Sequence, residues 1–179
     1  MKKIIAFAGS NSSTSINRQL VQHTLGYFSE FDLTFLDLND FEMPIFSVDR
    51  EKEGFPPQAQ QFIQAITQAD AIICSLAEHN RSYTVAFKNI MDWCSQLDMN
   101  FFHNKPMMLM STSPGGYGGG NVMKAAHSFF PKCGADVVTT FSLPSFYQNF
   151  TAGKISDEDL HNEHQEKTQF FKEKALLGR

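Results

Sequence analysis

The chain has little cysteine, no run of basic residues and no long apolar segment. Its three cysteines, Cys74, Cys94 and Cys133, are widely spaced and form no Cys-x-x-Cys pair, which indicates a reducing compartment and buried, apolar thiols. A formal net charge of −4 without a basic run gives no support to a nucleic-acid partner. No stretch is long enough to span a membrane. We therefore expect a cytoplasmic protein with neither a nucleic-acid nor a membrane partner.

Two phosphate-binding motifs are also missing. The chain contains no Gly-Lys-Ser/Thr, which excludes a P-loop for nucleoside triphosphates, and no Gly-x-Gly-x-x-Gly of a dinucleotide-binding fold. It also contains no internal repeat, low-complexity segment or linker, so its 179 residues predict one domain over residues 1–179. Phenylalanine is abundant, with 18 residues, and most of these side chains are expected in the core.

Apolar runs of strand length alternate with helical patterns. The runs lie at Lys3–Ala8, Leu33–Leu38, Ala71–Leu76, Met107–Ser111 and Val137–Leu143. Because runs such as Ala71–Cys74 are apolar on both sides, they are typical of parallel strands covered on both faces. The helical patterns follow Ser15 as an N-cap, then recur at Phe62–Ala69, Phe87–Leu97, Val122–Phe130 and in a polar segment from about Asp157, capped by Ser156, to Leu176. The alternation predicts an α/β three-layer sandwich with a five-stranded, doubly wound parallel sheet.

Ligands of such sheets bind beyond the carboxyl ends of the strands, so the loops at those ends are the candidate sites. The first loop, Gly9–Asn17, follows a buried strand and precedes a helix, and it is rich in Ser and Thr. Backbone N–H groups and hydroxyls at a helix N-terminus suit a monophosphate. A solvated loop with Ser15 as an ordinary cap is an equally good interpretation of this loop alone.

The second loop, Glu78–Ser82, follows the third strand and concentrates hydrogen-bonding groups that could bind the edge of a heterocycle. A plain turn with Thr84 as the next N-cap is about as good an interpretation. The third loop, Ser111–Gly120, is rich in glycine, which lets the main chain approach a flat ligand closely, and Tyr117 could stack on it. A flexible surface loop is the alternative there. Together the three loops favour flavin mononucleotide (FMN).

These loops resemble the motifs of the NADPH-dependent FMN reductase family, the flavodoxin-like group that contains chromate, quinone and azo-dye reductases. Gly9, Ser10, Ser15 and Asn17 match its first motif, although Ser12 stands where that motif has Arg. The longer second motif is matched by Glu78, Asn80, Ser82, Lys88, Asn89, Asp92 and Trp93, and the third resembles Ser111–Gly119. The resemblance implies a flavodoxin-like fold and FMN as the cofactor.

The resemblance also implies which residues hold the cofactor. Ser10, Ser15 and Asn17 would hold the phosphate, and Glu78–Ser82 with Pro114–Gly118 would frame the isoalloxazine ring. The full candidate set is Ser10, Ser12, Ser15, Ile16, Asn17, Glu78, His79, Asn80, Arg81, Ser82, Ser113, Pro114, Gly115, Gly116, Tyr117 and Gly118. Arg18, in the first helical turn, is expected to be solvated.

The expected activity is that of an NAD(P)H-dependent oxidoreductase. Reducing equivalents would pass from the nicotinamide co-substrate through FMN to a small acceptor, which is a quinone, a flavin, an azo compound or a metal oxyanion. Because the cofactor carries the chemistry, no catalytic side chain is expected. The competing hypothesis is a flavodoxin-like electron carrier that does not oxidise NAD(P)H; the mild net charge favours the enzyme.

A metal site or hydrolase is a third hypothesis, from His161 and His164 with glutamates nearby. A solvated polar helix face explains that spacing far better, so no metal is expected. The resemblance further implies a homodimer or homotetramer with the flavin near a subunit interface. The hydrophobic residues expected at that interface are Met43–Phe46, Trp93, Phe101 and Phe102.

Overall fold

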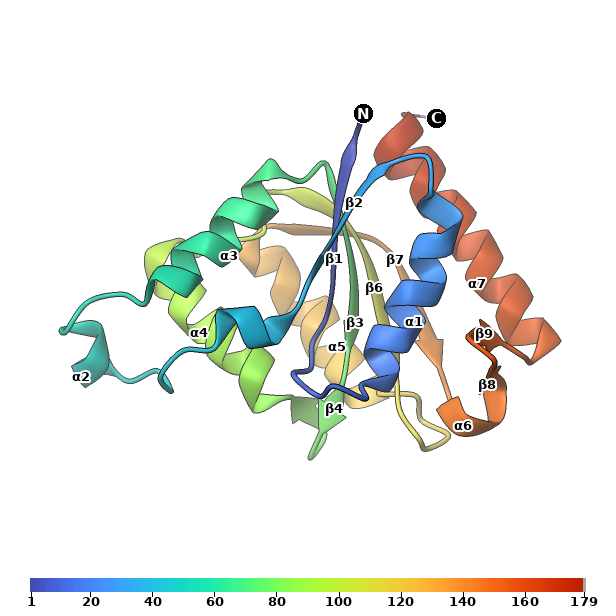
Figure 1. Cartoon of the computed structure of the whole chain (residues 1–179), viewed down its shortest axis with the longest axis horizontal. Helices are drawn as coiled ribbons and strands as arrows, with labels where there is room; N and C mark the ends of the chain where they lie inside the picture. Colours follow the sequence, from blue (N-terminus) through green and yellow to red (C-terminus); the bar gives the residue numbers. More distant parts are fainter. Residues whose placement is uncertain (179) are drawn as a thin grey trace.

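A computed structural model describes residues 1–178 and has a five-stranded parallel sheet at its centre (Figure 1). The strand order is β2-β1-β3-β6-β7. The strands are β1 (Lys3–Ala8), β2 (Asp32–Leu36), β3 (Ala71–Leu76), β6 (Lys105–Thr112) and β7 (Ala135–Leu143). The predicted α/β sandwich with a doubly wound sheet is confirmed, and each predicted strand falls within three residues of its observed bounds.

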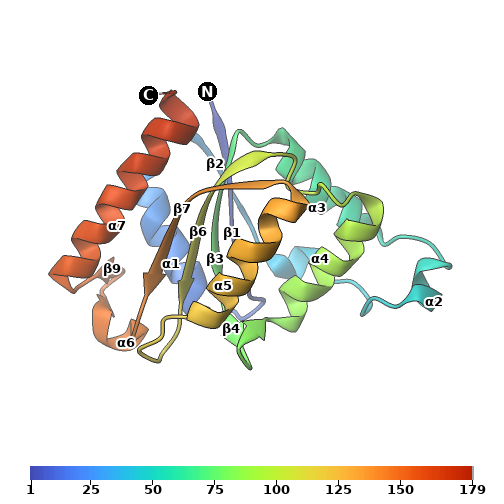
Figure 2. The same ribbon diagram turned by 180° about the vertical axis from the view of Figure 1, so that it is seen from behind.

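Helical layers cover both faces of the sheet (Figures 1 and 2). One layer consists of α1 (Ile16–Leu25) and α7 (Glu158–Phe171), and the other of α3 (Pro57–Gln68), α4 (Val85–Leu97) and α5 (Gly120–Phe129). Successive strand residues face opposite layers: Ile5 and Phe7 pack in the α3–α4–α5 core, whereas Ile4 and Ala6 pack in the α1–α7 core. This two-sided burial is why the inner strands β1 and β3 are almost entirely apolar.

Shorter elements connect these main ones. They are the 3₁₀ turns Gly26–Phe28, Leu38–Phe41 and Phe130–Cys133, the short helices α2 (Val48–Glu51) and α6 (Phe146–Asn149), the hairpins β4 (Glu78–His79) with β5 (Ser82–Tyr83) and β8 (Phe150–Thr151) with β9 (Lys154–Ile155), and a π-helical end at Lys172–Leu177. No helix within residues 1–178 combines the length and apolar character that crossing a membrane requires.

Two sequence expectations about α7 need correction. Its N-cap is Asp157, whose Oδ1 accepts a hydrogen bond from the Leu160 N–H at 3.0 Å. The Ser156 N–H instead donates to the carbonyl of Asn149, the last residue of α6, at 2.8 Å. A carboxylate at the N-cap also interacts favourably with the helix dipole. The regular α-helix ends at Phe171 rather than Leu176, because the last turns widen into a π-helix.

Most of the hydrophobic residues expected at a subunit interface lie in the core. Trp93 is 1% exposed, and Phe101 and Phe102 are fully buried. Met43 is also buried, since it joins the same core, whereas Ile45 is exposed. The prediction is therefore wrong for Trp93, Phe101, Phe102 and Met43, whose apolar surface is already covered within this chain.

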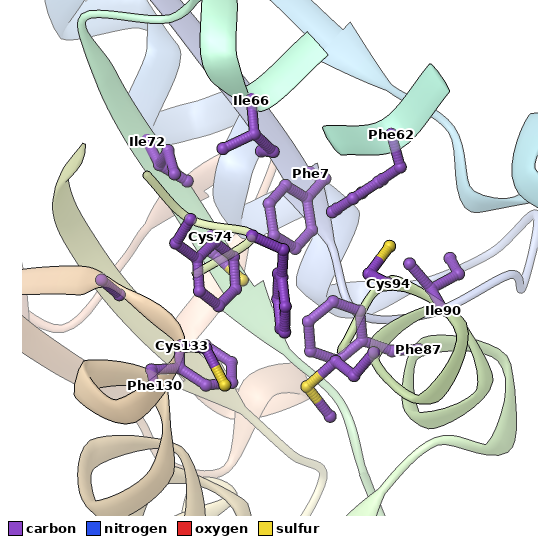
Figure 3. Close-up of a cluster of buried hydrophobic side chains, with 14 of the residues drawn as sticks. Phe7, Phe62, Ile66, Ile72, Cys74, Phe87, Ile90, Cys94, Phe130 and Cys133 are labelled. Carbon is purple, nitrogen blue, oxygen red and sulfur yellow. The ribbon is translucent and has the colours of Figure 1, made fainter. Parts of the chain in front are cut away.

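The core between the sheet and α3, α4 and α5 is built from aromatic rings and thiols (Figure 3). The Phe7 ring meets those of Phe62 and Phe87 with centroid separations of 5.7 and 5.6 Å. The three cysteines are free and buried here, as predicted. Burial raises the pKa of each thiol, to about 12 for Cys94 and about 11 for Cys133, so these cysteines act as packing groups.

Candidate functional site

Three loops come together at the carboxyl edge of the sheet, opposite the edge where both termini lie (Figure 1). They are the β1–α1 loop, the segment between β3 and α4, and the β6–α5 loop. β1 and β3 are neighbours in the sheet, and the chain crosses from one side of β1 to the other between β2 and β3. The loops therefore meet at the point where the strand order reverses, which is where doubly wound folds bind ligands.

Gly9 brings the first loop close to β3. Its N–H donates to the Ser75 carbonyl at 2.8 Å, and a Cβ at this position would lie 2.8 Å from Leu76 Cδ2. A side chain here would push the loop away from the sheet. Glycine thus favours the close approach of the two strand ends, because any Cβ here would force the buried Leu76 side chain to shift.

Hydroxyl groups organise the loop that leads into α1. The Ser12 N–H donates to Ser10 Oγ at 3.2 Å, and the Thr14 N–H donates to Ser12 Oγ at 3.3 Å. Ser15 Oγ accepts from the Arg18 N–H at 3.2 Å, which confirms Ser15 as the N-cap. The loop therefore presents hydroxyls at the positive end of a ten-residue helix, a setting that favours an anion.

Asn17 holds this helix end against the sheet. Its Oδ1 accepts from Ser75 Oγ at 2.7 Å and from the Thr112 N–H at 3.1 Å, while its Nδ2 donates to the Thr112 carbonyl at 3.2 Å. The residue is 1% exposed. Its side chain therefore joins α1 to β3 and β6.

Arg18 does not supply a free cation to the loop. Its guanidinium pairs with Asp37 at 2.7 Å and lies 4.9 Å above the centre of the Phe35 ring. Hydrogen bonds from the Asn39 main chain and from Arg18 lower the pKa of Asp37, which keeps the pair ionised. The expectation of a solvated Arg18 is thus wrong, because its guanidinium forms an ion pair with Asp37, which directly follows β2.

The second segment is a hairpin rather than an open loop. Residues 78–79 and 82–83 pair antiparallel, with Glu78 opposite Tyr83 and His79 opposite Ser82. The two connecting residues, Asn80 and Arg81, have φ angles of 51° and 63°. Two successive positive φ angles define a type I′ turn, which matches the twist of a hairpin. Thr84 caps α4, as the alternative interpretation of this segment predicted.

Glu78 joins the second loop to the third. Its carboxylate accepts from the Asn121 and Val122 N–H groups at 2.8 and 2.9 Å and from Asn121 Nδ2 at 3.0 Å. Partial burial raises the pKa of Glu78, but these hydrogen bonds outweigh it, and the pKa lies below its ordinary value. Glu78 therefore serves as an ionised cap for the N-terminus of α5.

Two serine hydroxyls, one from β6 and one from β7, hydrogen-bond to the third loop. Ser111 Oγ and Ser142 Oγ each donate to the Gly118 carbonyl at 2.8 Å. Gly118 has a φ of 59°, and a Cβ there would lie 2.4 Å from Ser142 Oγ. The Tyr117 ring lies over Gly120, where it sits 5.8 Å from Lys124 Nζ. This loop is thus fixed in place, and its tyrosine faces α5.

A cavity of about 360 Å³ lies between the three loops. Its volume falls in the range typical of small-molecule sites. It brings together nine of the residues expected from the sequence: Ser10, Ser12, Ser15, Ile16, Asn17, Glu78, His79, Ser113 and Pro114. The other seven do not line it: Asn80, Arg81, Ser82, Gly115, Gly116, Tyr117 and Gly118.

Four further residues line the cavity. Thr14, Ala77 and Thr112 adjoin the predicted motifs, so a wider boundary would have included them. Tyr147 comes from α6, which carries no motif, and it is 71% exposed. Nothing in the sequence near Tyr147 signals its position, which depends on how the segment after β7 folds back.

Within residues 1–178 no group of His, Cys, Asp or Glu is arranged to hold a metal ion. The interpretation of His161 and His164 as a solvated face is nevertheless wrong for His164, which is fully buried. It packs against α1 and β7, because α7 turns this side toward the sheet.

Comparisons with known proteins extend this description. A family model described as NADPH-dependent FMN reductase matches residues 2–148. An NADPH:quinone oxidoreductase of Arabidopsis thaliana is 31% identical over 123 residues, which cover 66% of this chain and 61% of that protein. A 2-hydroxy-1,4-benzoquinone reductase of Burkholderia sp is 34% identical over 119 residues, 65% of this chain and 63% of that protein. The chain thus spans about three fifths of the length of these curated relatives.

Solved structures match over nearly the whole chain. The flavoenzyme NAD(P)H:(acceptor) oxidoreductase FerB of Paracoccus denitrificans has a TM-score of 0.72 at 22% identity, covering 98% of this chain and 99% of its own. An FMN-dependent NADH-azoreductase of Bacillus anthracis, solved with FMN, has a TM-score of 0.68 at 14% identity, covering 98% of this chain and 100% of its own. These likenesses confirm the flavodoxin-like fold.

Proposed function

The chain belongs to the NADPH-dependent FMN reductase family, and we propose that it binds FMN at the carboxyl edge of its sheet and transfers electrons from NAD(P)H to a small acceptor. The observation that carries this proposal is the convergence of three sequence-distant loops on one cavity beside the N-terminus of α1. Quinones and azo compounds are the acceptors that the names of relatives suggest.

The residues of the cavity fit the two ends of FMN. The phosphate would be held by the hydroxyls of Ser10, Ser12, Thr14 and Ser15 together with the first N–H groups of α1. A dianionic phosphate needs no cationic partner here, because the helix end supplies positive potential and the hydroxyls supply donors. The ring would lie between the chain at Ala77–His79 and the chain at Thr112–Pro114.

Bound FMN supplies the redox chemistry: NAD(P)H, a proton and a quinone give NAD(P)⁺ and the hydroquinone, a transfer of two electrons and two protons. The protein's part is to position and shield the reacting groups. Glu78 and Asn17 fix the loops by hydrogen bonds, so the cavity is formed before a ligand enters. No side chain is assigned to proton transfer.

A negative charge introduced among the hydroxyls proposed to hold the FMN phosphate tests this proposal. Titration of the purified protein with FMN, followed by flavin fluorescence, should give saturable binding. Ser12→Glu should weaken FMN binding by at least about tenfold while leaving riboflavin binding within about twofold, because only FMN brings a phosphate near the new carboxylate. Ser13→Glu is the matched control, since Ser13 is exposed in the same loop but does not line the cavity.

Three results would contradict the proposal: no FMN binding by the wild type, equal losses for FMN and riboflavin in Ser12→Glu, or an equal loss in Ser13→Glu. Mixing the FMN-loaded protein with NADPH under anaerobic conditions separates the enzyme from an electron carrier. In an enzyme, NADPH reduces the flavin and its visible absorbance falls within the time of one catalytic turnover, whereas the flavin of an electron carrier keeps its absorbance.

The remaining expectations are part of the same proposal. We propose one domain over the whole chain, a cytoplasmic location and a homodimer or homotetramer. Exposed apolar side chains in the segment before α2, on α2 and at the start of α4 support association, namely Ile45, Val48 and Val85. Light scattering on the purified protein should give a mass of at least twice 20.2 kDa, and a monomer across the micromolar range would contradict the oligomer.

A further inference from the structure

Arg81 occupies a backbone conformation that its side chain disfavours. It is the second residue of the type I′ turn between β4 and β5, with a φ of 63°. Glycine is the preferred residue there, because a Cβ crowds the backbone when φ is positive. Nothing in the turn itself requires arginine, and Arg81 is exposed, so the fold gains no packing from it.

Arg81 also carries a charge that no ion pair or hydrogen bond fixes within residues 1–178, although it helps to lower the pKa of Glu78 on the same hairpin. Four other cations of the chain do have partners: Arg18 pairs with Asp37, Lys88 with Asp92 at 2.6 Å, Arg50 donates to the Ile45 carbonyl at 2.9 Å, and Lys124 lies over the Tyr117 ring.

The hairpin that carries Arg81 separates two cavities. His79, on β4, lines both the 360 Å³ cavity described above and a second cavity of about 290 Å³. The second cavity has a buried apolar floor of Leu38, Phe41 and Met43. Neither cavity has a lysine or arginine among its lining residues. An anionic molecule that enters beside the flavin would therefore meet Arg81 as the available positive charge.

We propose that Arg81 binds a phosphate group of the nicotinamide dinucleotide and so determines the affinity of this protein for its electron donor. The proposal rests on the proposed function, in which a dinucleotide must approach the flavin site. The FMN phosphate is not the anion concerned, because the hydroxyl cradle at α1 accounts for it. The dinucleotide carries a pyrophosphate, and NADPH also carries a 2′-phosphate; a guanidinium can bind either with two parallel hydrogen bonds.

Substitutions at Arg81 test this role. The dissociation constants of NADP⁺ and NAD⁺ for the FMN-loaded protein are measured by calorimetry for the wild type, Arg81→Gln, Arg81→Lys and Arg81→Gly. Arg81→Gln and Arg81→Gly should raise the constant for NADP⁺ at least about tenfold, as expected for a lost charge-assisted hydrogen bond, and Arg81→Lys should restore part of it. Lys88→Gln is the control, because it removes an exposed cation from the same edge that is already paired.

The two dinucleotides identify the phosphate. A loss for NADP⁺ alone indicates the 2′-phosphate, and an equal loss for both indicates the pyrophosphate. Arg81→Gly also separates binding from folding, since glycine suits the turn and its melting temperature should not fall. Added salt should weaken dinucleotide binding more in the wild type than in Arg81→Gln.

Unchanged dissociation constants for both dinucleotides in Arg81→Gln would overturn this proposal, as would an effect confined to the KM of the acceptor. FMN titration of the same samples keeps the two proposals apart. Intact FMN binding with unchanged dinucleotide binding removes only the role of Arg81, whereas a wild type that binds no FMN removes both.

Discussion

The two faces of the sheet are packed in different ways. The core under α3, α4 and α5 consists of aromatic, aliphatic and thiol groups (Figure 3). The core under α1 and α7 contains a polar cluster, which consists of His23, Thr24, His161, His164 and Thr168. In both cores helices pack on one face of the same sheet, so the cores differ in the side chains that the helices contribute.

Hydrogen bonds connect the members of this cluster. Thr24 Oγ1 lies 2.9 Å from the Leu20 carbonyl, 3.5 Å from the Met110 sulfur and 2.9 Å from His164 Nε2. When the single hydroxyl proton is donated to Leu20, neutral His164 donates from Nε2 to Thr24 and its Nδ1 is an acceptor. Nδ1 has no partner among the described residues, and the His23 ring lies 5.2 Å away.

The comparison shows where the fold is sensitive to its surroundings. A buried neutral histidine is tolerated only while it remains neutral, whereas rings and thiols with raised pKa values do not change charge near neutral pH. The buried core under α1 and α7 should therefore respond to acid, and the buried core under α3, α4 and α5 should respond only to loss of volume. Four predictions test this difference, from the largest expected effect to the smallest.

Acidification should destabilise the protein through His164. Burial first, then the nearby His23 and His161, lower the pKa of His164 from 6.5 to about 3. The unfolded chain therefore binds a proton between pH 6.5 and 3 that the folded chain does not, so stability is full above pH 6.5 and falls as the pH drops. The expected loss is on the order of 5 kcal/mol between pH 7 and pH 3, measured by urea unfolding.

His164→Leu should remove most of this pH dependence, while its stability at pH 7 changes less than its stability at pH 4. His127→Gln is the matched control, since His127 is exposed on α5 in the other layer. The comparison of the two faces breaks down if His127→Gln flattens the pH profile as much as His164→Leu does.

Removal of a ring from the other core should act at all pH values alike. Phe7 is fully buried on β1 between Phe62 and Phe87. Phe7→Ala should reduce the free energy of unfolding by about 3–5 kcal/mol, from lost burial and the cavity left behind. Phe170→Ala, at a side chain 46% exposed on α7, should change it by less than about 1 kcal/mol. A Phe7→Ala effect that grows strongly in acid would contradict the proposed independence from pH.

The sequence predicted the sheet because its strands are buried on both faces. Ala71–Leu76 reads as a continuous apolar run, and every residue of it is buried, with alternate side chains in the two cores. The candidate site was predictable where residues follow a strand end directly, as for Ser10–Asn17. The carboxyl ends of parallel strands lie at the same edge of the sheet, so the loops that follow the strands were expected to lie together there.

The rest depends on tertiary packing that one-dimensional patterns do not contain. His164 lies on a polar helix whose buried side is set by the partners it meets on α1 and β7. Trp93 packs in the core, and its Nε1 donates to the carbonyl of Pro44, 49 residues earlier in the chain, at 2.7 Å. Tyr147 lines the cavity, whereas Tyr117, the tyrosine expected there, does not, because the path of each loop decides which ring faces the cavity.

Loss of the hydrogen bonds between Glu78 and the N-terminus of α5, at the carboxyl edge of the sheet, should have a smaller effect on stability. Glu78→Gln keeps the shape but loses the ionised acceptor shared by Asn121 and Val122. Stability should fall by about 1.5–3 kcal/mol at pH 7, the range for hydrogen bonds to a charged group. Because the pKa of Glu78 is lowered on folding, the difference from the wild type should vanish as the pH falls below that pKa.

Urea unfolding of Glu78→Gln at pH 7 and at pH 3 measures this difference. Glu163→Gln is the control, since its carboxylate is exposed and pairs with Lys167 on the surface of α7. An equal loss in both variants would show that the cap on α5 adds nothing beyond surface charge.

The smallest effect should come from the turn that joins β4 to β5. Arg81→Gly relieves a left-handed backbone but adds entropy to the unfolded chain, so the two contributions oppose each other. We expect a net stabilisation of about 0.5 kcal/mol, because type I′ turns strongly favour glycine at this position. Asn80→Gly should change stability less, since asparagine already tolerates positive φ. Destabilisation by Arg81→Gly would mean that the arginine supports the fold itself, and the position would then have no unexplained residue to assign to a ligand.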